Sequence, residues 1–226
     1  CRNRLRRNGG LEVSLLQTRK FWGWGYEGVS ASPAQLEMAK SGLSALLGGT
    51  LVRREPPSLD QIRLEPSSLA SAPSQLEALI DRSPRERLGH AMGKSYRDLA
   101  RAVRGDFSTA PDAVAFPESE QELVDLLSFA TEQRCSVIPY GGGTSVHGGV
   151  TPTRGEGPVL SLDLRRMSGV VEVDRESLLA RVRAGTLGPE LEAQLKPHGL
   201  SLRHFPQSFE HSTVGGWIAT RAGGHF

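Results

Sequence analysis

Residues 136–145 read Ser136-Val137-Ile138-Pro139-Tyr140-Gly141-Gly142-Gly143-Thr144-Ser145, a short apolar segment that runs into three consecutive glycines and two hydroxyl residues. Glycine has no Cβ, so it adopts left-handed backbone conformations and lets neighbouring N–H groups converge on one point. A strand that ends in such a loop is a natural cradle for a phosphate or pyrophosphate. Taken alone, the loop reads equally well as a flexible surface turn.

Two common phosphate-binding motifs do not fit this loop. A dinucleotide fingerprint requires glycine at its first, third and sixth positions, but the sixth residue counted from Gly141 is Val146. A P-loop requires Lys and Ser or Thr directly after its second glycine, but Gly149 and Val150 follow Gly148. The sequence therefore favours neither a classical NAD-binding fold nor an NTPase.

The residues before the loop predict a β-α-β unit. Residues 113–117 indicate a short buried strand, and Ser119 and Glu122 have the spacing of a capping box, which starts a helix. An apolar stripe with helical spacing follows, formed by Leu123, Leu126, Leu127 and Ala130. The next strand begins at Cys135. Ligands of parallel α/β units usually lie beyond the carboxyl ends of the strands, where the glycine loop stands.

The residues after the loop predict three more strands. Residues 159–164 alternate between apolar and polar side chains, as expected of a strand. Residues 170–173 and 179–184 indicate two strands joined by the polar turn 174–177. These patterns favour a sheet with antiparallel pairs.

A short helix is expected to pack on that sheet. Leu187, Leu191 and Leu195 recur every four residues before Pro197 and Gly199 end the pattern. The sequence as a whole predicts an α+β fold, with a β-α-β subdomain followed by a mixed or antiparallel sheet with flanking helices.

Composition limits the class of protein. The 226 residues, with 38% hydrophobic content, can bury a sizeable core. A net charge of +2 gives no reason to expect a nucleic-acid partner. No apolar run is long enough to span a membrane, and the basic residues 2–7 lack the apolar segment of a secretion signal. Cys1 and Cys135 are the only cysteines, which argues against a disulfide framework and suits a reducing compartment.

The chain is expected to have three regions. Residues 1–52 form an N-terminal extension with the aromatic arm Phe21-Trp22-Gly23-Trp24-Gly25, whose rings should pack on the domain. Residues 53–85 are rich in Pro and Ser and indicate an extended linker with at most one helix, around residues 74–80. Residues 86–226 form the main domain. In its first part, residues 94–99 are expected to place their charges on a solvated helix face.

No metal site is expected. The six histidines show neither the HExxH spacing nor another convincing ligand spacing. We interpret His147, near the glycine loop, as a structural or solvated residue, and the same holds for His90, His198, His204, His211 and His225.

Several stretches, taken in order, resemble the flavoenzymes of the vanillyl-alcohol-oxidase type, which have a bipartite (PCMH-type) FAD-binding domain. They are residues 115–119, residues 139–145 with Gly148 and Gly149, residues 182–185 and residues 212–217. Residues 20–26 and 207–213 make the chain similar to one group of these enzymes, the alkylglycerone-phosphate (alkyldihydroxyacetonephosphate) synthases and their bacterial relatives. The resemblance covers about residues 20–226.

The resemblance implies an FAD site. The residues that would hold the pyrophosphate are Pro139, Tyr140, Gly141, Gly142, Gly143, Thr144 and Ser145. Those that would line the flavin side are Gln207, Ser208, Phe209, Glu210, His211, Ser212, Thr213, Thr220, Arg221, Ala222 and Gly223. A hydroxyl-rich helix start with no ligand is the alternative interpretation of residues 212–223. Some relatives link FAD covalently through a histidine where this chain has Thr144, so the expected FAD is non-covalent.

By the same resemblance, the whole protein would be an alkylglycerone-phosphate synthase of ether-lipid biosynthesis. In that redox-neutral reaction a long-chain alcohol replaces the fatty acid of acyl-dihydroxyacetone phosphate by way of a flavin adduct, so the cofactor carries the chemistry. One alternative is an FAD-dependent oxidase or dehydrogenase of 2-hydroxy acids such as D-lactate or glycolate, because the same domain serves both. A non-enzymatic, truncated flavin-binding module is another.

The sequence is expected to be a fragment. It begins at Cys1 and stops at Phe226 within flavin-binding sequence, so the fold is expected to be incomplete at the C-terminus. The catalytic residues and the domain for a small-molecule or lipid substrate would then follow Phe226, and the fragment alone would be inactive. Peripheral membrane association and a homodimer both remain open. The style of residues 203–208 favours a bacterial cytoplasmic protein; a eukaryotic relative would be peroxisomal.

Overall fold

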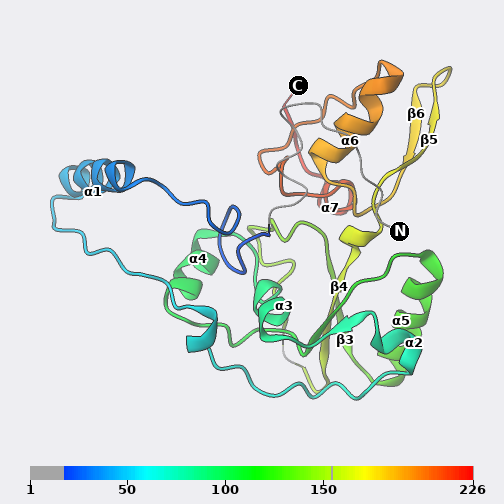
Figure 1. The fold of residues 1–226 in the computed structure, drawn as a ribbon, viewed down its shortest axis with the longest axis horizontal. Coiled ribbons are helices and arrows are strands. Elements are labelled where there is room, and N and C mark those ends of the chain that lie inside the picture. The colour runs from blue at the N-terminus through cyan, green and yellow to red at the C-terminus, as the bar shows by residue number, and fades with distance from the viewer. Residues whose placement is uncertain (1–17, 154, 226) are drawn as a thin grey trace.

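The computed structural model describes residues 18–153 and 155–225, so the predictions on Cys1, residues 2–7 and Phe226 fall outside the described residues. Figure 1 shows a main sheet with helices around it and a smaller second part, built from a β-hairpin and helices, that stands above it. The α1 helix (Pro33–Leu47) projects to one side, and none of its residues is buried.

The main sheet has the strand order β1-β2-β4-β3. Its strands are β1 (Ile80–Asp81), β2 (Ala113–Ala115), β3 (Ser136–Tyr140) and β4 (Val159–Asp163). The β4 strand pairs in parallel with β2 on one side and with β3 on the other, and β1 adds an antiparallel edge. The predicted β-α-β unit is confirmed, with α5 (Glu120–Glu132) as its helix, but its two strands are not neighbours because β4 lies between them.

The strand predicted at residues 159–164 is confirmed as β4, although its neighbours β2 and β3 are parallel to it, and the predicted antiparallel pairing is found between residues 170–174 and 179–182. All five residues of β4 are buried, and Ser161 and Asp163 are 0% exposed. A central strand of a parallel sheet is covered on both faces, so alternation of polar and apolar residues does not mark a solvated face there. The two polar side chains point into the interior of the domain instead.

The start of α5 follows the sequence closely. The Ser119 hydroxyl accepts a hydrogen bond from the Glu122 N–H at 3.2 Å, and a Glu122 carboxylate oxygen accepts one from the Ser119 N–H at 3.2 Å. Of the predicted stripe, Leu126 and Ala130 are buried. The stripe is wrong at Leu127, which is 42% exposed. Phe129 is buried instead, so the buried face is rotated slightly from the predicted one.

Replacing Ser119 with alanine should lower the free energy of unfolding by about 1 kcal/mol, because one of the N–H groups at the start of α5 loses its acceptor. Chemical denaturation of the full-length protein measures this change. Ser128→Ala is the matched control, since Ser128 is exposed in the interior of the same helix and bonds only to a Val124 carbonyl. An equal loss in both variants would contradict a capping role for Ser119.

The segment 53–85 carries more structure than an extended linker. Its predicted helix is present as α2 (Ser74–Glu77), and the 3₁₀ turn η1 (Leu59–Gln61) and the strand β1 also belong to it. Leu69 is buried in the core between the main sheet and α5. The three-region division therefore remains a prediction, and residues 69–81 contribute to the edge of the main sheet. The helices α3 (Pro84–Gly89) and α4 (Tyr96–Val103) follow.

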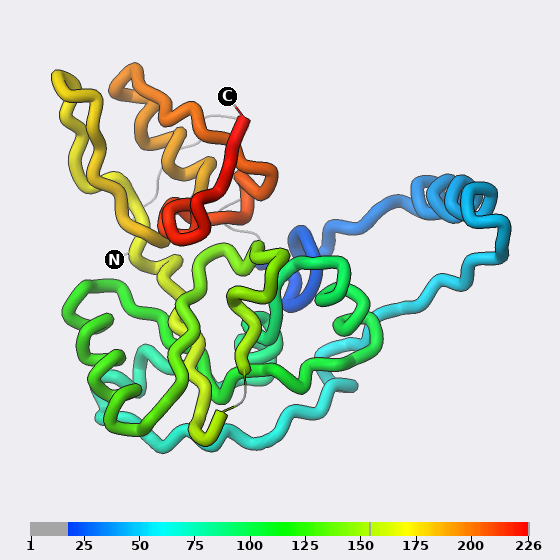
Figure 2. The backbone as a smooth tube through the Cα atoms, turned by 180° about the vertical axis from the view of Figure 1, so that it is seen from behind, coloured from blue at the N-terminus to red at the C-terminus, as the bar shows by residue number. Residues whose placement is uncertain are grey.

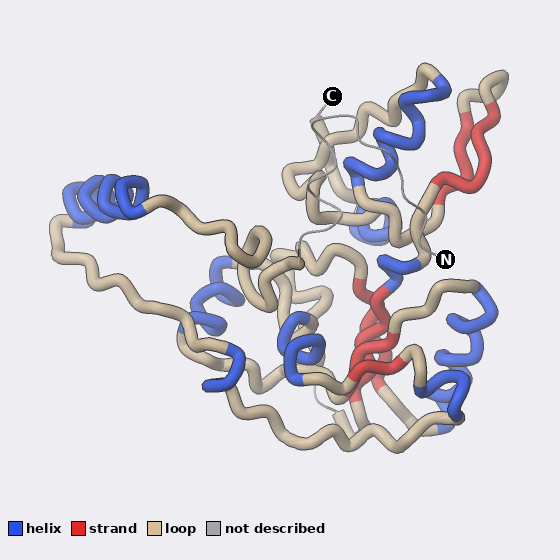
Figure 3. The backbone as a smooth tube through the Cα atoms, in the orientation of Figure 1, coloured by secondary structure: helices blue, strands red, loops and turns tan. Residues whose placement is uncertain are grey.

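The second part contains the predicted hairpin and leucine helix. The strands β5 (Val170–Asp174) and β6 (Leu179–Val182) pair antiparallel, after the turn η2 (Leu164–Arg166). Leu191 and Leu195 of α6 (Gly188–Leu195) pack against this hairpin, as predicted, and Trp217 of α7 (Val214–Thr220) completes the core. The turn η3 (Lys196–His198) ends α6. Figure 3 shows the hairpin beside these helices, and Figure 2 shows the same arrangement from behind.

The aromatic arm packs on the domain, as expected. Phe21 and Trp22 contact the core formed by α3, α4 and Phe107, and the rings of Phe21 and Phe107 lie 5.9 Å apart. Trp24 lies 5.7 Å from the ring of His211. The arm, residues 18–29, therefore runs from α3 and α4 to the segment that precedes α7.

Candidate functional site

The glycine loop that follows β3 lies directly against residues 211–213. A Cβ at Gly141 would overlap the Thr213 hydroxyl, and one at Gly142 would overlap the His211 carbonyl oxygen. Gly143 has φ +67° and faces the Tyr140 hydroxyl. Only glycine allows this close approach, so the structure brings together the two groups of residues that the sequence assigned to the cofactor.

The loop also leaves its amides available. The backbone N–H groups of residues 142–145 have no hydrogen-bond acceptor within the described parts of the chain. Successive free N–H groups in a glycine-rich loop form an anion-binding concavity. The loop therefore offers the kind of donors that the pyrophosphate of FAD would need.

The hydroxyls of the second group already have partners. Ser212 donates to the Ser208 carbonyl at 2.8 Å and accepts from the Trp217 indole N–H at 2.6 Å. The Thr213 hydroxyl accepts from the Gly216 N–H at 3.3 Å and so caps α7. These bonds hold residues 208–213 together and fix them to the start of α7.

The rest of this group is divided between core and surface. Phe209 packs near Trp217, with 6.1 Å between ring centroids. The Thr220 hydroxyl donates to the Gly216 carbonyl at 2.8 Å. The exposed members are Gln207, Glu210, Thr220, Arg221 and Gly223. The role of these residues in binding the flavin stays a prediction.

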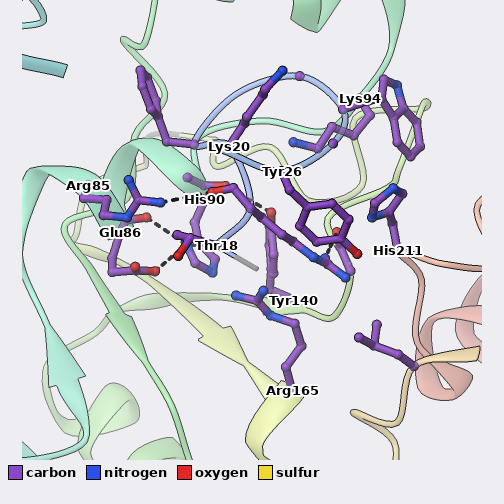
Figure 4. Close-up of a pocket in the computed structure, with 18 residues that line it drawn as sticks. Thr18, Lys20, Tyr26, Arg85, Glu86, His90, Lys94, Tyr140, Arg165 and His211 are labelled. Atoms are coloured by element: carbon purple, nitrogen blue, oxygen red, sulfur yellow. Dashed lines mark hydrogen bonds and ion pairs between the residues drawn. The ribbon is translucent and has the colours of Figure 1, made fainter. Parts of the chain in front are cut away.

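A cavity of about 370 Å³ lies between the arm and the glycine loop. Figure 4 shows its lining, with Tyr26 and Lys20 from the arm, Glu86 and His90 from α3 and the residue after it, and Arg165 from η2. Of the predicted site residues, Tyr140, Gly142 and His211 line it, whereas residues 220–223 do not. We call this space the arm pocket.

The floor of the arm pocket is a buried ion network around Asp163. Its carboxylate accepts from Arg165 Nε at 2.8 Å and lies 3.0 Å from His90 Nε2. The other ring nitrogen of His90 lies 2.7 Å from the Glu86 carbonyl oxygen. Burial alone would raise the pKa of Asp163, but the bonds from His90 and Arg165 outweigh it and lower that pKa to about 2. Asp163 is therefore ionised at neutral pH.

Tyr140 links the network to the glycine loop. Its hydroxyl donates to the Gly89 carbonyl at 3.0 Å, and its ring lies 4.1 Å from that of His90. Burial raises the pKa of Tyr140 to about 12, so the phenol stays neutral. Tyr140 is thus held in place and packs directly against Gly143.

The prediction that residues 94–99 carry solvated charges is wrong for two residues. Lys94 lines the arm pocket, and Asp98 is 6% exposed, where it accepts from the Ser95 N–H at 3.0 Å. The cause lies in Gly93, where a Cβ would overlap the Ser145 carbonyl oxygen, and in the bond from Lys94 N–H to that carbonyl at 2.8 Å. These contacts hold the segment against the glycine loop.

Sequence reasoning assigned no site role to the charged lining of the arm pocket. The missed residues are Arg19, Arg85, Glu86, His90, Lys94, Asp163 and Arg165. They come from the arm, from α3 and the residue after it, from the segment before α4, and from β4 and η2, so no single spacing along the chain marks them as a group. Gly93, directly before Lys94, is the one local signal that a backbone passes close by.

Two further findings concern the described residues alone. None of their helices combines the length and apolar character needed to cross a bilayer. Their His, Cys, Asp and Glu side chains form no group of three or more that could hold a metal ion.

Comparisons with known proteins give consistent matches. The family model described as the FAD binding domain matches residues 111–226. An alkyldihydroxyacetonephosphate synthase of Dictyostelium discoideum is 44% identical over 139 residues, 62% of this chain and 23% of that protein. The glycolate oxidase subunit GlcD of Bacillus subtilis is 33% identical over 118 residues, 52% of this chain and 24% of that protein.

A solved structure of an alkyldihydroxyacetonephosphate synthase has the same fold over most of this chain. The TM-score is 0.78 at 30% identity, and the match covers 91% of this chain and 44% of that one. The chain spans about a quarter of the length of the curated relatives it matches.

Proposed function

The chain belongs to the family of FAD-binding domains, and from this premise we propose that the whole protein is an alkylglycerone-phosphate synthase. It would replace the fatty acid of acyl-dihydroxyacetone phosphate with a long-chain alcohol and so form an ether bond. The observation that carries the proposal is the 44% identity to an alkyldihydroxyacetonephosphate synthase. The glycolate oxidase subunit is 33% identical over 118 residues, and a D-lactate dehydrogenase of Archaeoglobus fulgidus is 40% identical over 111 residues, so these shorter matches rank a 2-hydroxy-acid oxidase or dehydrogenase second.

In this proposal, the chain's own residues bind and orient FAD. The free N–H groups of residues 142–145 would hold its pyrophosphate, and residues 207–213, packed against the loop, would face the flavin side. Bound FAD supplies an electrophilic ring to the reaction. Some relatives link FAD covalently through a histidine at the position of Thr144. A threonine cannot form that bond, which supports non-covalent binding.

The residues that act on the substrate are proposed to lie outside this chain. The described pockets include no group that we assign to a chemical step. The fragment would accordingly bind the cofactor and need further sequence for turnover. A lipid substrate, peripheral membrane contact and a homodimer belong to the same proposal for the whole protein.

A cytoplasmic location is proposed for a bacterial protein, and a peroxisomal one for a eukaryotic protein. Cys135 is a free thiol, which supports a reducing compartment.

The absorbance spectrum of the protein expressed from its complete reading frame tests the cofactor. Flavin bands in the near-ultraviolet and blue that are released into solution on denaturation are expected for non-covalent FAD. Bands that stay with the precipitated protein would contradict the non-covalent prediction. A colourless protein that FAD cannot reconstitute would contradict the flavoenzyme proposal.

Substrate assays on the coloured protein separate the two activities. Ether-lipid precursor formed from acyl-dihydroxyacetone phosphate and hexadecanol, with no net flavin bleaching, is the expected result. Anaerobic bleaching by D-lactate or glycolate, with no ether product, would favour the oxidase instead.

A further inference from the structure

Five cationic residues line the arm pocket, and besides Lys20 and Arg85 they include three from separate parts of the chain. Arg19 comes from the arm, Lys94 from the segment before α4, and Arg165 from η2 after β4. Arg165 is the member of this trio that forms an ion pair with a described carboxylate, that of Asp163. Within the described ranges, neither Arg19 nor Lys94 has a carboxylate at ion-pair distance.

Most of the carboxylates around the pocket already have a partner at short range. Glu27 pairs with Arg85 at 2.6 Å, and Glu86 lies 3.9 Å from the His90 ring. Asp98 accepts from the Ser95 hydroxyl at 2.8 Å and attracts Lys94 only at longer range. The pocket therefore holds more positive than negative charge.

Arg19 gives the most direct indication that the pocket binds an anion. Its Nη1 donates to the Gly142 carbonyl at 3.1 Å, so the guanidinium reaches from the arm to the glycine loop. Its Nη2 is buried and has no hydrogen-bond partner among the residues described. A buried charged donor without an acceptor is costly, and an anion in the pocket would remove that cost.

The three cations also repel one another. Burial, and then the charge of Arg165, lowers the pKa of Arg19. Burial, and then the charges of Arg19 and Arg165, lowers the pKa of Lys94 to about 8. Burial, and then the charge of Arg19, lowers the pKa of His211. The same uncompensated positive potential therefore reaches each group.

The arm is held in the position that closes this pocket. Arg85 of α3 donates to the Arg19 carbonyl at 3.0 Å and pairs with Glu27. One guanidinium therefore binds the arm near both of its ends. Lys20 N–H donates to the Gly25 carbonyl at 3.2 Å and keeps the arm folded between them. These bonds fix the backbone at Arg19, and the bond from its Nη1 to the Gly142 carbonyl orients the side chain.

We propose that the arm pocket is a phosphate-binding site in which Arg19, Lys94 and Arg165 contact the oxyanion and the arm closes over it. Guanidinium and ammonium groups together match a phosphate, which accepts several charge-assisted hydrogen bonds. A cavity of about 370 Å³ accommodates a phosphate with a small organic group attached. The phosphate has two sources, the diphosphate of FAD or the phosphomonoester of a triose phosphate, and both rest on the proposed function.

Binding measurements on the full-length apoprotein test this site. Lys94→Met is the primary variant, because no described residue bonds to its Nζ and the fold should survive the change. Arg19→Met is the second. Each should weaken phosphate binding about 10- to 100-fold, as expected for loss of one hydrogen bond to a charged group. Arg166→Met is the matched control, since it removes the same charge from an exposed pair with Glu118 and should change nothing.

Two ligands distinguish the sources. FAD affinity is measured by quenching of flavin fluorescence, and dihydroxyacetone phosphate affinity by calorimetry. Weakened FAD binding with unchanged triose-phosphate binding assigns the site to the cofactor, and the opposite pattern assigns it to a substrate phosphate. Lys94→Arg should retain the affinity that Lys94→Met loses.

The inference fails if Lys94→Met and Arg19→Met bind both ligands as tightly as the unmodified protein does. Failure of the unmodified protein to bind FAD is a separate result, which contradicts the proposed function. In that event the triose-phosphate measurement still decides the inference: binding that both variants weaken supports the site, and absence of binding overturns it.

Discussion

Replacing Gly142 with alanine is expected to weaken FAD binding by the full-length protein about a hundredfold. The added Cβ would overlap the carbonyl of His211 and approach the Ser212 backbone, and neither is a flexible side chain that can move aside. Overpacking of this kind costs up to about 3 kcal/mol. If that energy is lost from FAD binding, the affinity falls about a hundredfold. The glycine loop and residues 207–213 would separate, and the cofactor would lose one of its two walls.

Gly149→Ala is the control for this prediction. Gly149 lies in the same connection, but its added Cβ would meet only the Ser145 hydroxyl at an ordinary 3.5 Å. Reconstitution of apoprotein with FAD, followed by fluorescence quenching, measures both variants. Equal affinities for the two variants would mean that the close contact at Gly142 is not needed for the cofactor.

Replacing Asp163 with asparagine is expected to lower the free energy of unfolding by about 3–5 kcal/mol, because it leaves Arg165 and His90 without their buried carboxylate. Asp163 is 0% exposed, so water cannot reach its place to solvate the partners that lose the carboxylate. Thermal denaturation should show a fall in the midpoint of about 10 °C for a chain of this size. Glu118→Gln is the control, because the Arg166–Glu118 pair is exposed and should contribute less than about 1 kcal/mol.

The pH dependence of stability gives this prediction a sign. The pKa of Asp163 in the folded protein is about 2, below its ordinary value of 3.8. Its contribution is therefore complete above pH 4 and is lost as the pH falls toward 2. The difference in stability between the unmodified protein and Asp163→Asn should shrink over that range, and a difference independent of pH would contradict a charge-based role.

The sequence predicts those parts of the fold that rest on local signals. The capping box at Ser119 and the break from β3 into glycines each involve residues close together in the chain, and both are confirmed. The leucine spacing of α6 is equally local, and its buried face is also confirmed. The FAD-binding family followed from ordered motifs, and the match to residues 111–226 confirms it.

The positions that the sequence does not predict depend on contacts between distant segments. β4 is the central strand between β2 and β3, and its side chains are buried because other segments cover the faces of the sheet, which nothing within residues 159–163 reports. Lys94 looks like a surface residue before a helix, and its burial comes from the approach of Ser145, far along the chain. Arg19 reaches Gly142 across 123 positions of sequence. The charged part of the site therefore emerges only in three dimensions.

The place of β4 also ties the speed of folding to the cofactor loop. β2 and β3 precede β4 in the chain. They do not pair with each other in the sheet, because β4 lies between them. The sheet closes only when residues 141–158 double back, and the entropy of that closure grows with the length of the connection. This connection contains the glycine loop, so the same stretch of chain affects both the rate at which the sheet assembles and the binding of the cofactor. An insertion there would change both.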